Sequence, residues 1–334
     1  MKQRVTISDI AAAASVSKQT VSRALNSKGE IKADTRDRIL KIADDMGYRP
    51  NRLARAMSTN RTMMIGMVIP DITNPFFPEV ARGVHDVAFE KHYNVLLCNT
   101  DDESRQEMDT LELLASQGVD GIINFSHKAD EEELLAFAES YRPIILVNRE
   151  ITHPHIDTLI VNNYHGTALA IECFVAKGHK TIGMLTNERL SLSLTTRVQG
   201  YFETLDKHKL ENNHRLIETG DANLSGGYDA AKRLIARRPD ITAIFAYNDV
   251  MGLGAIRACL DAGKRVPDDI AIIGFDDIQL AAMNNPSLSS VHVDKYALGR
   301  EAFGRLHKRI VDPNCDLPPP SVNMSLVLRE STKP

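Results

Sequence analysis

The hydrophobic positions along this chain change their spacing near residue 63. Before that point they recur every three or four residues in short stretches, which is typical of amphipathic helices. After it, short apolar runs alternate with stretches of helical pattern such as 76–92 and 103–117. Buried strands separated by helices predict parallel sheets covered by helices on both faces. We expect strands at 65–70, 94–100, 119–125, 143–148, 158–162, 181–186, 241–249, 269–276, 287–294 and within 322–330.

This alternation occurs twice, with a break near Asn162 and Asn163. Each half has the usual size of a domain, about 130 to 140 residues. The sequence therefore predicts an α/β body with two lobes of doubly wound parallel sheets. A smaller helical head precedes the body.

Two helices are expected at the start of the head. Thr6 followed by Asp9 is a capping-box pattern, so the first helix should begin near Ile7. Ser17 can cap a second helix over 18–25. Two short helices joined by a tight turn predict a helix-turn-helix.

A third helix is expected over about 34–46, with Gly47 directly after its end. Pro50 then interrupts the pattern, and 51–57 follows as a further short helix. We therefore separate a head at 1–50 from a hinge helix and linker at 51–62.

The charge is distributed unevenly along the chain. The 334 residues carry a net charge of −4, but residues 1–61 hold 13 Lys and Arg against 6 Asp and Glu. A basic head on an acidic body indicates that the head contacts a polyanion. No apolar run is long enough to span a membrane, and we identify no signal peptide. Four widely spaced cysteines argue against disulfides or zinc and favour a cytoplasmic protein: Cys98, Cys173, Cys259 and Cys315.

In a helix-turn-helix, the second helix enters the major groove of DNA. Lys18 and Gln19 stand at the start of that helix and can bond base edges. Thr20, Ser22 and Arg23 can hold phosphates. The alternative is a solvated surface helix whose polar residues bind nothing.

Four motifs occur together in one order. They are the helix-turn-helix at 5–26, GYRPNRLARAM at 47–57, NDVMGLGA at 248–255 and IIGFDD at 272–277. In this combination the chain resembles the LacI/GalR (lactose-repressor) family of bacterial transcription regulators. The resemblance implies a homodimer that binds near-palindromic double-stranded operator DNA, most simply as a repressor.

The resemblance also implies DNA-contacting residues in the head and hinge. Met57 stands where the family usually places a Leu that is wedged into the minor groove, and Met can also act as a wedge. The alternative for 51–57 is a plain linker. The implied residues are Thr6, Ser17, Lys18, Gln19, Thr20, Ser22, Arg23, Asn26, Tyr48, Asn51, Arg52, Leu53, Ala54 and Met57.

For the body, the resemblance implies a fold like that of the periplasmic sugar-binding proteins, with an effector-binding and dimerisation domain at 63–334. Lobe 1 is expected at about 63–162 and 292–321, and lobe 2 at about 163–291 and 322–334. A small-molecule effector would bind between the lobes, at the carboxyl ends of the strands. The implied effector residues are Asn74, Phe76, Phe77, Asn148, Arg149, Arg197, Asn248 and Asp276.

Most of these residues have a structural alternative. Asn74 can form a turn before Pro75, the two Phe rings can belong to the core, and Asn248 can cap the next helix. Asp276 and Asp277 can be a loop pair. Two positions depart from the family: Ala222 replaces an aromatic pocket wall, and Val293 replaces a polar Gln.

The sign of the cleft gives an expectation about the effector. Arg149 and Arg197 outnumber the one obvious carboxylate, Asp276, and Asn148 stands where ribose-type sites have Asp. A positive cleft favours an anion, so we expect a sugar acid or sugar phosphate over a neutral sugar or a purine. In the alternative, Asn148 bonds a neutral hydroxyl and Arg149 pairs with Asp276.

Two other classes of protein compete with a regulator. An α/β enzyme would need a cofactor or catalytic motif, but in the nearest dinucleotide fingerprint, from Gly252, Arg257 replaces the third glycine. A sugar-binding protein without a regulatory role would not need the basic head. We therefore predict no enzyme activity, no cofactor, no metal, no membrane association and no catalytic residue. The chain also lacks an added C-terminal heptad helix, which predicts a dimer rather than a tetramer.

Overall fold

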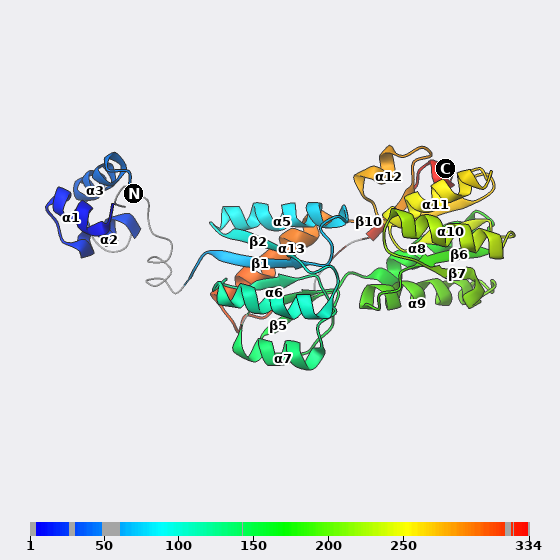
Figure 1. Cartoon of the computed structure of the whole chain (residues 1–334), viewed down its shortest axis with the longest axis horizontal. Coiled ribbons are helices and arrows are strands. Elements are labelled where there is room, and N and C mark those ends of the chain that lie inside the picture. Colours follow the sequence, from blue (N-terminus) through cyan, green and yellow to red (C-terminus); the bar gives the residue numbers. More distant parts are fainter. Residues whose placement is uncertain are drawn as a thin grey trace. The chain divides into compact units, whose positions relative to one another are not determined.

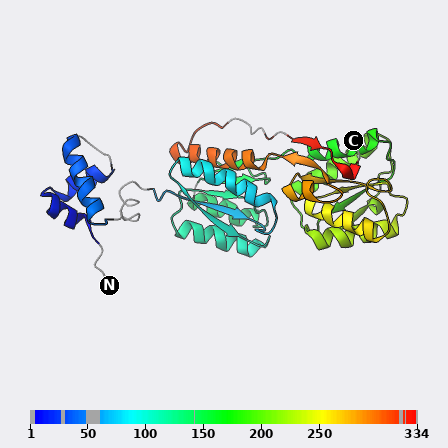
Figure 2. The same cartoon turned by 90° about the horizontal axis from the view of Figure 1, so that it is seen from above.

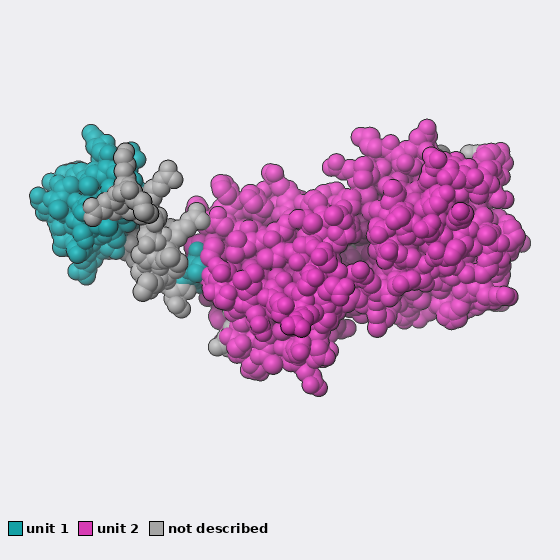
Figure 3. Space-filling view, viewed as in Figure 1, with its two compact units in different colours: residues 1–62 teal, residues 63–334 magenta. Residues whose placement is uncertain are grey.

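The computed structural model describes residues 5–26, 31–48, 61–141, 143–317, 322 and 324–332. For Asn26 it describes the backbone only. The chain divides into two compact units, residues 1–62 and 63–334, shown in different colours in Figure 3. Each unit is described by itself. No described helix is long and apolar enough to cross a membrane.

The described residues of the first unit form α1 (Ile7–Ala14), α2 (Lys18–Asn26) and α3 (Ala33–Asp45). The expected caps are present. The Asp9 carboxylate accepts a hydrogen bond from the Thr6 backbone N–H at 2.8 Å, and the Ser17 hydroxyl accepts one from the Thr20 N–H at 3.1 Å. Gly47, at the end of α3, has a φ of +67°, as its position after the helix predicted. The three helices share one core, which includes the fully buried Ile10, Val21 and Ile39.

The second unit contains two sheets, each with helices on both faces (Figure 1). The first sheet has the order β2-β1-β3-β4-β5, and all its pairs are parallel. Its strands are β1 (Met64–Ile69), β2 (Asn94–Asn99), β3 (Ile122–Asn124), β4 (Ile144–Val147) and β5 (Ile156–Leu159). The helices between them are α5 (Phe76–Glu90), α6 (Ser104–Ser116) and α7 (Glu131–Ser140). We call this sheet with its covering helices lobe 1.

The second sheet, with its helices, forms lobe 2 and has the order β11-β10-β9-β8-β6-β7. Its strands are β6 (Ile182–Thr186), β7 (Ile217–Thr219), β8 (Ala243–Ala246), β9 (Ala271–Asp276), β10 (Ser289–Val293) and β11 (Met324–Val327). Its helices are α8 (Asn163–Ala176), α9 (Leu192–Lys207), α10 (Leu224–Arg237), α11 (Asp249–Asp261) and α12 (Gln279–Met283), with short 3₁₀ turns at His214–Leu216 and Glu330–Thr332.

Two features of the second sheet differ from the expectation. The edge strand β7 was not predicted, because it has only three residues and none of them is fully buried. Strand β11 pairs antiparallel with β10, whereas the predicted sheets were parallel throughout. The chain between β10 and β11 passes through a lobe 1 helix, Lys295–Val311, and not through a helix packed on the lobe 2 sheet, so it does not form the crossover that would make these two strands parallel.

After β10 the chain returns to lobe 1 and forms α13 (Lys295–Val311). The second crossover therefore follows Val293, and residues 292 and 293, expected in lobe 1, belong to the lobe 2 sheet. Helix α13 lies alongside α5 (Figure 2). The two backbones come close at two glycines: a Cβ at Gly83 would lie 2.2 Å from the Tyr296 carbonyl oxygen, and one at Gly299 would lie 2.1 Å from that of Val80.

We therefore expect Gly299→Ala to destabilise the protein by about 1 to 3 kcal/mol, because the helices must separate to admit the methyl group. The control is Gly304→Ala on the same helix, where an added Cβ meets nothing within 4 Å. That change should stabilise by up to about 1 kcal/mol, since Ala is the better helix former. Urea unfolding monitored by circular dichroism measures both, and equal shifts would contradict the close-approach argument.

Candidate functional site

The first candidate site is the exposed face of α2 in the first unit. Val21 and Ala24 are buried against the head core, which leaves Lys18, Gln19 and Arg23 exposed on the opposite side. Thr6 and Ser17 are also exposed, whereas Thr20, Ser22 and Tyr48 are partly buried. The Thr20 hydroxyl lies 2.9 Å from that of Ser17. The residues expected in the hinge, Asn51, Arg52, Leu53, Ala54 and Met57, and the side chain of Asn26 lie outside the described part of the chain.

The second candidate site is a cavity of about 410 Å³ in the second unit, lined by residues of both lobes. Lobe 1 contributes residues that follow β1, β2, β3 and β4, and lobe 2 contributes residues that follow β6, β7, β8 and β9. The cavity thus lies at the carboxyl ends of the strands, as expected for open α/β sheets. Seven of the eight expected effector residues line it: Asn74, Phe76, Phe77, Asn148, Arg197, Asn248 and Asp276.

Arg197, in the first half of α9, is the most constrained of these side chains. It is buried, with 7% exposure. Its Nε donates to Asn163 Oδ1 at 2.9 Å, its Nη1 donates to the Tyr247 carbonyl oxygen, and its Nη2 lies 3.6 Å from Asp276 Oδ1. The guanidinium also lies over the Phe275 ring, 3.6 Å from the centroid. Its direction is therefore fixed before any ligand arrives.

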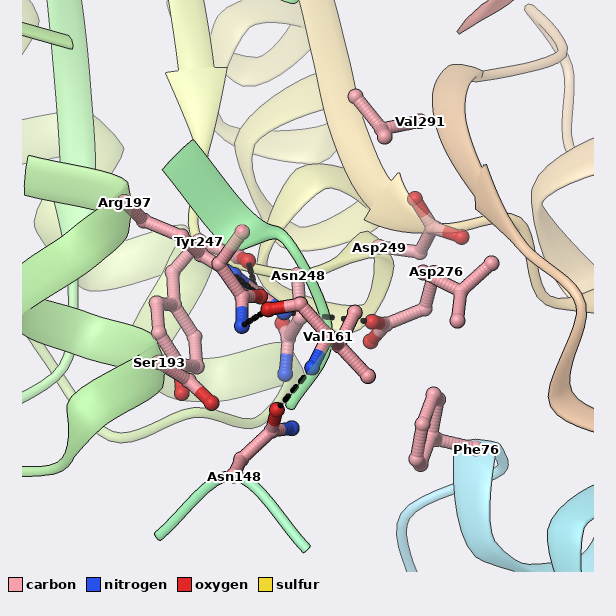
Figure 4. A network of polar contacts seen from close by, with 12 residues as sticks. Phe76, Asn148, Val161, Ser193, Arg197, Tyr247, Asn248, Asp249, Asp276 and Val291 are labelled. Carbon is pink, nitrogen blue, oxygen red and sulfur yellow. Dashed lines mark hydrogen bonds and ion pairs between the residues drawn. The ribbon is translucent and has the colours of Figure 1, made fainter. Parts of the chain in front are cut away.

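Asp276 and Asp277 take different directions from the end of β9. Asp276 is almost fully buried and lines the cavity beside Arg197 (Figure 4). Burial raises the pKa of the Asp276 carboxyl to about 6, against the opposing effect of the nearby cations. Asp277 instead bonds His292 at 2.8 Å and Arg329 at 2.6 Å, so the two aspartates are not merely a loop pair.

The three expected asparagines of the cavity also accept hydrogen bonds from the backbone. Asn74 Oδ1 accepts from the Phe76 N–H at 3.0 Å, and Asn248 Oδ1 accepts from the Met251 N–H at 2.9 Å as the cap of α11. Asn148, at a φ of +56°, accepts from the Val161 N–H at 2.9 Å (Figure 4). These bonds hold the amide groups in place and leave their nitrogen donors for other partners, except that Asn248 Nδ2 donates to the Ala222 carbonyl at 3.2 Å.

The two phenylalanines at the start of α5 lie both in the core and in the cavity lining. Phe77 is 8% exposed and meets Phe125 edge to face, with centroids 5.9 Å apart. Phe76 is less buried, packs against Phe77 and faces the cavity opposite Asp276 (Figure 4). The pair forms an apolar wall on the lobe 1 side.

Arg149 is the exception among the expected residues, because it is not part of the cavity lining. Its Nη1 is buried, and within the described residues it has no hydrogen-bond partner. Asp276 lies near Arg197 rather than Arg149, so the alternative in which Arg149 pairs with Asp276 is wrong. Consecutive residues at a strand end point in opposite directions, and here Asn148 takes the cavity side.

The charge of the lining overturns the expectation of a positive cleft. Six carboxylates line the cavity, against the guanidinium groups of Arg189 and Arg197. The argument for an anionic effector therefore fails. Sequence reasoning missed five of the carboxylates, although two of them directly follow a predicted strand: Asp71, Asp101, Asp102, Glu188 and Asp221.

Residues of the two lobes meet directly at the cavity. Arg189 donates from Nη1 to the Asp101 carbonyl oxygen at 2.8 Å and lies 3.4 Å from Asp102 Oδ2. Lys128 Nζ donates to the Leu190 carbonyl oxygen at 2.7 Å. His127 and Ser193 also line the cavity, and none of these polar residues was singled out in the sequence. His127, Lys128 and Arg189 stand in the loops that directly follow β3 and β6, and this position is the signal that could have found them, whereas Ser193 lies in the first turn of α9.

Comparison with known proteins finds a matching family model for each of the two units. Residues 6–51 match the model for bacterial regulatory proteins of the lacI family, and residues 62–322 match that for periplasmic binding proteins and the sugar binding domain of the LacI family. The chain belongs to the LacI family. This confirms the resemblance noted in the sequence, the two-lobed α/β fold with its helix-turn-helix head, and the assignment as a transcription regulator rather than an enzyme.

Several relatives with similar sequences are named as repressors. The chain is 32% identical to the HTH-type transcriptional repressor PurR of Mannheimia succiniciproducens, with 98% of each chain covered. It is 34% identical to the ribose operon repressor of Halalkalibacterium halodurans, covering 98% of this chain and 97% of the relative. A structure of the Lac repressor dimer bound to operator and an anti-inducer superposes with a TM-score of 0.87, at 26% identity and 99% coverage of both chains.

Proposed function

We propose that this LacI-family repressor acts in the cytoplasm as a homodimer on near-palindromic operator DNA, and that a neutral, polyhydroxylated metabolite in the cavity controls its operator affinity. The residues that line the cavity are the observation that favours a neutral, polyhydroxylated effector. It has buried, oriented donors and acceptors, an apolar wall at Phe76 and Phe77, and no excess of positive charge. Hydroxyl groups both donate and accept, so a sugar-like ligand suits this mixture.

Two solved structures of similar proteins support the dimer, the operator DNA and the neutral sugar in this proposal. The Lac repressor structure is a dimer bound to operator, and another similar structure, at 28% identity and a TM-score of 0.74, is a complex of the regulator CelR with cellobiose. A two-fold dimer would place two copies of α2 on symmetric half-sites. As the resemblance implies, the minor groove would be contacted by the hinge residues Asn51, Arg52, Leu53, Ala54 and Met57.

Selection of operator fragments from genomic DNA tests the DNA-binding part. Lys18→Ala or Gln19→Ala should weaken specific binding by about 1 to 3 kcal/mol and relax the preference at one base pair in each half-site. Lys41→Ala, an exposed lysine on α3, serves as a charge-matched control for the first variant. Equal weakening on every DNA sequence would show that Lys18 and Gln19 contact only phosphates.

Calorimetry with matched sugars tests the effector part. D-glucose, D-ribose and cellobiose would be compared with gluconate, ribonate and glucose 6-phosphate. We expect a neutral member to bind and its anionic counterpart to bind more weakly, because six carboxylates line the cavity. Tighter binding of the acid or phosphate would contradict a neutral effector and leave the repressor assignment unchanged.

The pKa of Asp276 predicts how effector binding depends on pH. If ligand hydroxyls donate to this carboxylate, only the ionised form binds well, and its pKa is about 6 in the folded protein. Affinity should then fall about tenfold between pH 7 and pH 5, as the carboxyl takes up its proton. Asp276→Asn should bind weakly at both pH values and lose this dependence. Affinity that rises on acidification would exclude the acceptor role.

A further inference from the structure

A buried ammonium group lies where the chain crosses from lobe 2 back to lobe 1. Lys295 is the first residue of α13 and is 2% exposed. Its Nζ donates to the carbonyl oxygens of Asp276 at 2.7 Å and Asp277 at 2.9 Å, and Val293 O lies at 3.4 Å. An ammonium has three protons, so these carbonyls use its donors. A buried cation of this kind is retained only with such partners.

The carbonyls that Lys295 holds belong to an unusual piece of backbone. Asp276 has a φ of +104° and Asp277 one of +55°. Two consecutive non-glycine residues in this region are costly, and they persist only where surrounding contacts hold them. This backbone sends Asp276 into the cavity and Asp277 toward His292 and Arg329. The ammonium therefore stabilises the turn that gives Asp276 its direction.

Lys295 also contributes to the charge around Asp276. The charged groups that affect this buried carboxyl come from three helices: Arg197 on α9 and Lys295 on α13 favour its ionised form, whereas Asp249 on α11 is a like charge. The Asp249 carboxyl has its own pKa raised, chiefly by burial. Lys295 thus offsets part of the cost of an ionised Asp276 in the lining.

The same ammonium also contacts a second helix of lobe 1, the lobe to which α13 belongs. Its Nζ lies 3.7 Å from Glu79 Oε2, in the first turn of α5. That turn begins with Phe76 and Phe77, which form the lobe 1 wall of the cavity. One cation therefore contacts the end of the lobe 2 strand β9 and the start of a lobe 1 helix.

We propose that Lys295 is the positioning residue of the effector site: it fixes the direction of Asp276 by holding the backbone at 276 and 277, and through Glu79 it connects that turn to α5. The proposal rests on the proposed function in one respect, that Asp276 contacts the effector. Lys295 itself does not line the cavity and acts only through the groups it holds.

The test uses full-length protein without DNA or effector. Aspartate carboxyls labelled with ¹³C are titrated by NMR, with the Asp276 signal assigned by its loss in Asp276→Asn, and backbone exchange at 276–278 is followed by hydrogen–deuterium mass spectrometry. Lys295→Met should raise the Asp276 pKa above about 6 by about one unit or more and accelerate exchange at 276–278. Lys295→Arg should restore both toward wild type. Lys308→Met, at an exposed position of the same helix, is the control.

Unchanged titration and exchange in Lys295→Met would overturn the proposal, as would equal changes in Lys308→Met. Should Lys295→Met fail to fold, Glu79→Gln replaces it, because Glu79 has a 37% exposed side chain. That variant should accelerate exchange both in the first turn of α5 and at 276–278, and a change confined to α5 would refute the connection between the lobes. If the protein bound no operator, the proposed function would be wrong. The titration and exchange measurements would still decide the role of Lys295.

Discussion

Effector binding should weaken about a hundredfold or more in Arg197→Met, the largest functional effect we expect from one substitution in the cavity. The change removes the charged hydrogen bonds to Asn163 and to the Tyr247 carbonyl, each contributing about 1.5 to 3 kcal/mol, so these groups of the site lose the partner that orients them. It also leaves Asp276 without the guanidinium that lies 3.6 Å away. Met keeps much of the apolar stem that packs on Phe275. Calorimetry with the neutral sugar that binds wild type would measure the loss.

The control for this prediction is Arg189→Met. Arg189 lines the same cavity, but its side chain is 50% exposed, so its contacts with Asp101 and Asp102 are screened by water. We expect its effect to stay below about tenfold. Operator binding without effector should change little in either variant, because α2 belongs to the other unit. Equal losses in the two variants would show that the buried pair has no special role.

The largest effect on stability is expected for Asp157→Ala. Asp157, on β5, binds the buried Arg305 of α13 through both carboxylate oxygens, at 2.5 and 2.9 Å. The Arg305 side chain is only 4% exposed, so the substitution removes the carboxylate that binds this buried cation through two hydrogen bonds. Such a loss costs about 3 to 5 kcal/mol. Thermal unfolding of the purified protein would show it as a marked fall in Tm.

Glu301→Ala provides the matched control for that prediction, since Glu301 pairs with the same arginine at 3.4 Å but is 46% exposed. Exposed pairs contribute about 0 to 1 kcal/mol. Comparing the two variants therefore separates the stability contributed by a buried ion pair from that contributed by an exposed one. A destabilisation of similar size in both would mean that Arg305 is held mainly by its other contacts.

The strands were predictable wherever burial on both faces left a continuous apolar run. All six residues of β9 are buried, and its position followed directly from the sequence. Strand β7 lies at the edge of its sheet and is half exposed, so no such run marks it. The direction of β11 was not predictable for a related reason, because strand direction depends on the path of the crossover rather than on local pattern.

For the cavity too, the local sequence pattern predicts some features and not others. Strand ends could be located, and with them Asn148 and Asp276. The direction of each side chain could not, and this explains why Arg149 was expected in the lining and is absent from it. The predicted charge failed because residues far apart in sequence, such as Asp102 and Asp221, contribute to one surface. Counting charges in motifs alone leaves these residues out.

The return of the chain to lobe 1 has a consequence for synthesis on the ribosome. Val80 and Val84 of α5 are fully buried in the finished protein, on a helix that packs against α13. The chain completes β5 at Leu159 but α13 only at Val311, about 150 residues later. At the usual rate of ~5 to 20 residues per second, the nascent lobe 1 keeps an apolar face open for about 8 to 30 s. Its folding is completed only after most of lobe 2 has been translated, and chaperones that recognise exposed apolar surface have that interval in which to bind.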